Sequence, residues 1–152
     1  MVGDIRRDVS VTTGGGRDTV CVSSSVGWVS TAGSDPVPTF DSTGPSAIGR
    51  DLTINSGAGS DLISIGTSTV GRNVWLDAGT GNDFVGIDGM QVRRNLFISL
   101  GAGNDSLGVT NLRAFAAFFS GGSGTNSLST DTATRAGSGT LRHYQFRAVA
   151  NG

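Results

Sequence analysis

The sequence contains no lysine and no glutamate, so all 11 basic residues are arginine and all 12 acidic residues are aspartate. Lysine and glutamate are strong helix formers, and their absence argues against a helical bundle. The single cysteine, Cys21, excludes an intrachain disulfide and a thiolate metal site, and we expect it to be a small buried residue. The single histidine, His143, completes neither a metal–histidine pattern nor a Ser-His-Asp arrangement, so we expect a surface or packing role for it.

Long apolar runs and excess charge are also absent. No apolar stretch has the roughly 18 residues of a membrane-spanning helix, and residues 1–7 lack the apolar region of a secretion signal. The formal net charge of -1 predicts no general attraction to nucleic acid or to anionic membranes. We therefore expect no nucleic-acid partner and no membrane insertion.

Glycine, by contrast, accounts for 25 of the 152 residues and recurs at a fixed spacing. Arg50, Arg72 and Arg94 lie 22 residues apart in the sequence. A Gly-x-Gly-x-Asp segment follows each arginine and ends at Asp61, Asp83 and Asp105. A fixed period in this range is typical of a solenoid, in which each repeat forms one rung and contacts only its neighbours.

Apolar residues alternate in two short runs of each repeat, as in Leu52 and Ile54 before the glycine turn and Ile63 and Ile65 after it. Period-two alternation predicts strands with one buried face, and a third short strand ends each repeat. Three strands and about 22 residues per turn predict an all-β fold, a right-handed parallel β-helix of about five to six rungs.

We predict a single solenoid domain over the whole chain, in four parts. Residues 27–47 hold all three prolines, which cannot donate to a central strand ladder, so we expect a degenerate rung opened into a surface loop. The other parts are a first rung at 1–26, regular rungs at 48–130, and a loop with a C-terminal capping strand at 131–152.

A polar residue follows the arginine at the corner that precedes the first strand of each rung. These residues are Asp8, Asp51, Asn73 and Asn95. Asparagine and aspartate tolerate sharp corners and bond neighbouring backbone, so we interpret this column as a structural asparagine-type ladder. The arginines beside it are expected to be solvated and partly offset by nearby aspartates.

The aspartates of the glycine turns, Asp61, Asp83 and Asp105, should stack at the spacing of the rungs. Unscreened carboxylates so placed repel one another, and two arrangements relieve the repulsion. In the first, each aspartate accepts hydrogen bonds from backbone N–H groups of its own turn, while glycines supply positive φ angles. In the second, a calcium ion bridges successive rungs through aspartate and carbonyl oxygens.

The segment at 101–108, with Gly101, Gly103, Asp105 and Leu107, resembles the haemolysin-type (RTX) calcium-binding nonapeptide, although only one such segment occurs per 22 residues. That resemblance implies the calcium ion, with Asp61, Asp83 and Asp105 as ligands. The whole repeat also resembles β-strand repeats of large secreted planctomycete-type proteins. This second resemblance implies an extracellular or cell-surface scaffold.

The residues predicted to face outward on the first strands are Thr53, Asn55, Trp75, Asp77, Phe97 and Ser99. One aspartate among them falls short of the acidic pair that polysaccharide hydrolases use. We therefore expect no enzyme, with a polysaccharide lyase or hydrolase as the alternative.

Two aromatic residues, Trp75 and Phe97, occupy equivalent outward positions one rung apart, and Leu62 and Phe84 form a second outward pair. Adjacent exposed apolar side chains mark an interaction surface or a face covered by another part of the chain. Three functions follow: a noncatalytic structural or adhesive module that associates with itself or another scaffold protein, a calcium-binding repeat module, and a carbohydrate-binding or carbohydrate-degrading β-helix.

Overall fold

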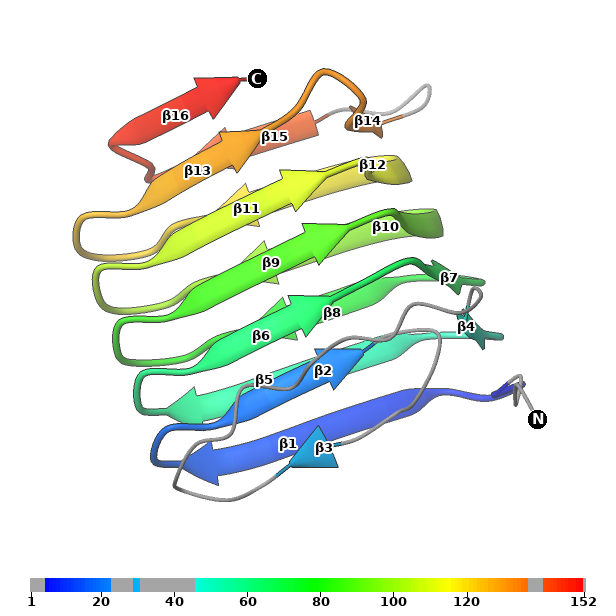
Figure 1. Ribbon diagram of the computed structural model, residues 1–152, viewed down its shortest axis with the longest axis horizontal. Coiled ribbons are helices and arrows are strands. Elements are labelled where there is room, and N and C mark those ends of the chain that lie inside the picture. Colours follow the sequence, from blue (N-terminus) through cyan, green and yellow to red (C-terminus); the bar gives the residue numbers. More distant parts are fainter. Residues whose placement is uncertain (1–4, 23–28, 31–45, 137–140, 152) are drawn as a thin grey trace.

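The computed structural model describes residues 5–22, 29–30, 46–136 and 141–151. This part of the chain is all-β, with parallel strands stacked as a β-solenoid of about 4 turns at a spacing of about 22 residues, which confirms the predicted fold class. Figure 1 shows the strands climbing from β1 at one end to β16 at the other. No helix in these residues is long and apolar enough to cross a membrane.

The first sheet stacks the first strands of successive turns. Its order is β1 (Val9–Gly15), β5 (Leu52–Ala58), β8 (Val74–Asp77), β10 (Met90–Ser99), β12 (Arg113–Ser120) and β15 (Leu141–Tyr144), all parallel. Short strands at the adjoining corner are β4 (Ser46–Ile48), β7 (Ser68–Val70) and β14 (Arg135–Ala136). Three separate strands per rung were expected, but β10 and β12 each run through this corner without a break. In β10 the register with β12 shifts between Val92 and Asn95, because Arg93 and Arg94 together oppose the single residue Phe115.

The second sheet stacks the strands that follow the glycine turns. In chain order these are β2 (Thr19–Val22), β6 (Leu62–Ile65), β9 (Phe84–Asp88), β11 (Ser106–Thr110), β13 (Ser127–Thr130) and β16 (Ala148–Asn151). Strand β3 (Val29–Ser30) pairs with β2 in the antiparallel sense, unlike the other strand pairs of this sheet.

Two of the predicted chain segments need further comment. Most of the degenerate rung predicted at 27–47 lies outside the described residues; of it the structure places β3, and β4 at its far end. The C-terminal segment was expected to end in one capping strand. It instead forms two strands, β15 and β16, which extend both sheets as a further partial rung. The positive φ of Gln145, 63°, marks the turn that separates them.

The core is a narrow apolar column between the two sheets, built by the alternation seen in the sequence. Leu52, Val74 and Leu96 share one register column and are fully buried, and Phe119 is the largest fully buried side chain. The glycine turns stack closely, since a Cβ atom placed on Gly79 would lie 1.8 Å from the carbonyl oxygen of the glycine one rung below. Its φ of 95° would also strain any other residue, so glycine is required there on two grounds.

Candidate functional site: three ladders and an aromatic groove

The turn aspartates form a continuous buried column. The Asp18 N–H donates to Asp61 Oδ1 at 2.7 Å, and the Asp61 N–H donates to Asp83 Oδ1 at 2.8 Å. The Asp83 N–H donates to Asp105 Oδ1, and the Asp105 N–H to Asn126 Oδ1, both at 2.9 Å. All five residues are buried, and the three central aspartates are at most 3% exposed. Each side chain therefore fixes the backbone of the rung below it.

This geometry bears on both arrangements considered for the turn aspartates. Backbone N–H groups do bind the carboxylates, but the donors come from the neighbouring rung, whereas the sequence suggested the aspartate's own turn. Among the described residues, no three or more His, Cys, Asp or Glu side chains are grouped so that they could hold a metal ion. Calcium binding at Asp61, Asp83 and Asp105 stays a prediction.

The second carboxylate oxygen, Oδ2, of each aspartate in this column is buried without a hydrogen-bond partner. At the equivalent position in the last turn, Asn126 has a donor in place of Oδ2, and this Nδ2 donates a hydrogen bond to the carbonyl oxygen of Gly121 at 2.7 Å. The equivalent acceptor for Asp83 is the carbonyl oxygen of Ala78, five residues earlier in the chain. An ionised Oδ2 cannot donate to a carbonyl, whereas a protonated one can.

Burial is the main cause of the altered acidity of this column. It raises the pKa of Asp83 from 3.8 to about 6, against the lowering effect of the Asp61 N–H. The neighbouring carboxyls of Asp105 and Asp61 add to the increase. Burial also raises the pKa of Asp105. The folded chain therefore favours neutral carboxyl groups in the middle of the column.

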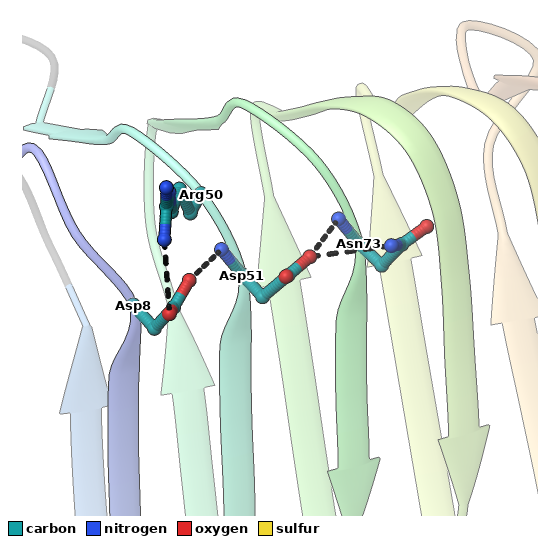
Figure 2. Close-up of polar contacts among 4 residues, drawn as sticks. All are labelled: Asp8, Arg50, Asp51 and Asn73. Atoms are coloured by element: carbon teal, nitrogen blue, oxygen red, sulfur yellow. Dashed lines mark hydrogen bonds and ion pairs between the residues drawn. The ribbon is translucent and has the colours of Figure 1, made fainter.

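The predicted polar corner is a second ladder, and it runs in the opposite direction. The Asp51 N–H donates to Asp8 Oδ1 at 3.2 Å, and the Asn73 N–H donates to Asp51 Oδ1 at 2.8 Å (Figure 2). Asn73 Nδ2 also reaches Asp51 Oδ1 at 3.2 Å, and the Asn95 N–H binds Asn73 Oδ1 at 3.3 Å. Each side chain here accepts from the rung above. These hydrogen bonds join the corner of each rung to the corner of the next.

A third ladder, which the sequence analysis missed, lies directly before the aspartate column. The Asn82 N–H donates to Ser60 Oγ at 3.2 Å, and the Asn104 N–H to Asn82 Oδ1 at 2.8 Å. The Thr125 N–H continues it by donating to Asn104 Oδ1 at 2.8 Å. The signal was present, because a short polar residue precedes the aspartate in each glycine turn.

The outward aromatic pair is part of a longer stack. Trp75 and Phe97 have ring centroids 6.1 Å apart and planes 10° apart, and Phe97 and Phe118 follow at 5.2 Å and 9°. Trp75 is 42% exposed. These rings, which we call the aromatic stripe, line a groove of about 430 Å³ over the outer face of the first sheet. The rest of its lining is Thr53, Ile54, Asn55, Leu76, Asp77, Ile98, Ser99, Ser120 and Tyr144.

The other candidate residues are not brought into this groove. Phe84 is 51% exposed and lies in register with Leu62 on the second sheet, away from the aromatic stripe. His143 is exposed and contacts the ring of Phe146 edge-on, with centroids 6.4 Å apart. Partial burial raises the pKa of the Cys21 thiol, which disfavours a reactive thiolate at neutral pH.

No family model, no curated protein and no solved structure matches the chain.

Proposed function

We propose that this chain is a noncatalytic structural or adhesive β-solenoid module of an exported or cell-surface protein, which associates through its aromatic groove with a second copy of itself. The observation that carries the proposal is the aromatic stripe of Trp75, Phe97 and Phe118 on a rigid, ladder-braced sheet. Outward aromatic side chains in adjacent rungs are typical of contact surfaces.

The chemistry of the groove supports a binding role over a catalytic one. Asp77 is the one carboxylate among its lining residues, and glycoside hydrolysis in most families uses a pair. The buried aspartates face neighbouring backbone and are engaged in holding the rungs together. Aromatic rings with a rim of amide, hydroxyl and carboxylate groups fit a contact surface whose core is apolar and whose edge is polar.

Sedimentation velocity over a range of protein concentrations tests this proposal. Wild type should form dimers, and Trp75→Ala should shift the equilibrium to monomers, because truncating a central interface aromatic typically costs more than about 1 kcal/mol. Phe115→Ala is the matched control, since Phe115 is 53% exposed and lies outside the groove lining. Monomeric wild type at every concentration, or equal loss in both variants, would contradict the proposal.

Calcium binding is the second candidate function, favoured by the four buried Oδ2 atoms without a hydrogen-bond partner. A bound cation would supply that missing partner and would tie its binding energy to folding. Thermal unfolding in millimolar calcium and in EDTA tests it, because a ligand at a thousand times its Kd stabilises by about 4 kcal/mol. Equal melting temperatures in the two conditions, with magnesium as the control ion, would remove this candidate.

A further inference from the structure

An arginine recurs on four successive rungs at one corner of the solenoid. The corner lies where β4, β7 and β14 sit beside the first sheet (Figure 1). The exposed residues that form this arginine stripe are Arg7, Arg50, Arg72, Arg93 and Arg94. Their backbones are stacked: the Arg72 N–H donates to Arg50 O at 3.0 Å, and the Arg94 N–H to Arg72 O at 3.1 Å. In the next rung the register places Phe115 opposite Arg93 and Arg94, so the stripe ends there.

Most of this positive charge has no acidic partner. In the part of the chain that the structure describes, the one ion pair joins Arg50 Nη1 to Asp8 Oδ2 at 3.9 Å (Figure 2). The corner ladder beside the stripe begins with acidic residues at Asp8 and Asp51. It then changes to Asn73 and Asn95, which leaves the arginines of the later rungs without a neighbouring carboxylate. The stripe is therefore more positive toward its C-terminal end.

The spacing makes this stripe a linear array of charge. Adjacent strands lie about 4.8 Å apart, so the three steps from Arg7 to Arg94 extend over about 14 Å. Like charges held at this distance repel, and a partner with regularly spaced anionic groups relieves the repulsion. Guanidinium groups pair with carboxylates in a two-point geometry that suits such a partner.

A second row of side chains runs parallel to the stripe. The aromatic residues Trp75 and Phe97 each lie three residues after an arginine of the stripe, Arg72 and Arg94, which is about 10 Å along an extended strand. A polymer along the rod can therefore contact charge on one side and ring edges on the other.

Of the polyanions, an acidic polysaccharide fits this surface best. Single-stranded nucleic acid is held by bases stacked on open aromatic faces. Here the rings of the aromatic stripe already stack on one another, so the faces between them are closed.

We propose that the arginine stripe binds an acidic polysaccharide that lies along the rod, with sugar carboxylates paired to successive guanidinium groups. The arginines of the stripe lie outside the groove lining, so binding there does not require the groove-mediated association proposed above, although a polymer on the stripe would share the ring edges of Trp75 and Phe97 with it.

Binding of polygalacturonate, measured by isothermal titration calorimetry at low salt, tests the proposal. The variant R72Q/R94Q should weaken binding by about tenfold or more, because an exposed ion pair is worth up to about a factor of five. The matched control R17Q/R147Q changes the net charge by the same amount with arginines outside the stripe, and it should bind within about twofold of wild type. Salt at about 1 M, where the screening length falls to about 3 Å, should abolish binding.

Four results would overturn the proposal. These are no binding by wild type, equal loss in the two variants, binding to neutral dextran at the same strength, and stronger binding of oligo(dT) than of polygalacturonate at equal salt. Circular dichroism of both variants checks that they keep the β-rich fold, which is expected because all substituted side chains are exposed.

Discussion

Replacing Asp83 by asparagine should stabilise the protein at neutral pH. The Oδ1 of the asparagine still accepts the Asp61 N–H, as the carboxylate does now at 2.8 Å. Its Nδ2 takes the place of the unpartnered Oδ2 and can donate to the Ala78 carbonyl oxygen, in the way that Asn126 donates to Gly121. That carbonyl already accepts Ser56 Oγ at 2.8 Å but has a second lone pair.

The magnitude follows from the acidity of Asp83. Its folded-state pKa of about 6 exceeds the ordinary value of 3.8, so folding favours the protonated form. The stabilising contribution of this carboxyl is therefore complete below pH 3.8 and is lost as the pH rises through 6. The loss amounts to at most about 3 kcal/mol, because each tenfold change in proton affinity is worth about 1.4 kcal/mol.

Urea and thermal unfolding of wild type and Asp83→Asn, each at a pH above 6 and a pH below 3.8, give the test. Above pH 6 the variant should melt higher by up to about 6 to 12 °C, given about 2 to 4 °C per kcal/mol for a chain of this size. Below pH 3.8 the two proteins should melt together. A variant that is less stable than wild type at neutral pH would show that an ionised carboxylate is needed there, as a bound cation would require.

Three further substitutions test other parts of the structure. Gly81→Ala should lower the free energy of unfolding by more than about 4 kcal/mol, since the new Cβ would lie 1.6 Å from a backbone oxygen of the rung below. Gly108→Ala is the control, because a Cβ there has no atom within 4 Å, and it should change the free energy of unfolding by less than about 1 kcal/mol. Equal urea midpoints of the two variants would refute the close-approach explanation. Phe119→Ala empties the largest fully buried position and should cost about 3 to 5 kcal/mol by the same measurement, and a loss under 1 kcal/mol would mean that the site is not packed as described. The hydrogen bond from the Thr134 side chain lowers the pKa of Asp131, so the stabilising contribution of the ionised Asp131 is present at neutral pH and lost as the pH falls through the folded-state pKa. Asp131→Asn should therefore lower the urea midpoint at neutral pH but not in acid. An effect of equal size at both pH values would refute this role of Asp131.

The repeat period predicted which residues stack, and this part of the fold could be read from the sequence. Asp61, Asp83 and Asp105 form one column, and Trp75 lies beside Phe97, because a fixed period places equivalent residues one above another. The period does not reveal which way a side chain turns along the rod. That direction depends on the backbone at the turn, which points each N–H toward one neighbouring rung only.

Two other features could not be predicted from the sequence, because they involve departures from the 22-residue period. Phe118 continues the aromatic stripe but lies 21 residues after Phe97, since β12 is one residue shorter at the corner than β10. The same deletion places Phe115 opposite Arg93 and Arg94, so the series of Arg50, Arg72 and Arg94 ends at that rung. Register from backbone pairing reveals both features, because it follows hydrogen bonds and not residue counts.

The three ladders also make a rung a unit that can be exchanged. The turns that end at Asp83 and Asp105 offer the rung above and the rung below the same acceptors, donors and glycine gaps. Adding or removing one such 22-residue turn leaves every ladder intact. An insertion or deletion of a few residues would instead move the residues of each column out of register with those of the neighbouring rungs. The length of the rod can therefore vary in whole rungs during evolution or by design, with the distance between its two ends set by the number of copies.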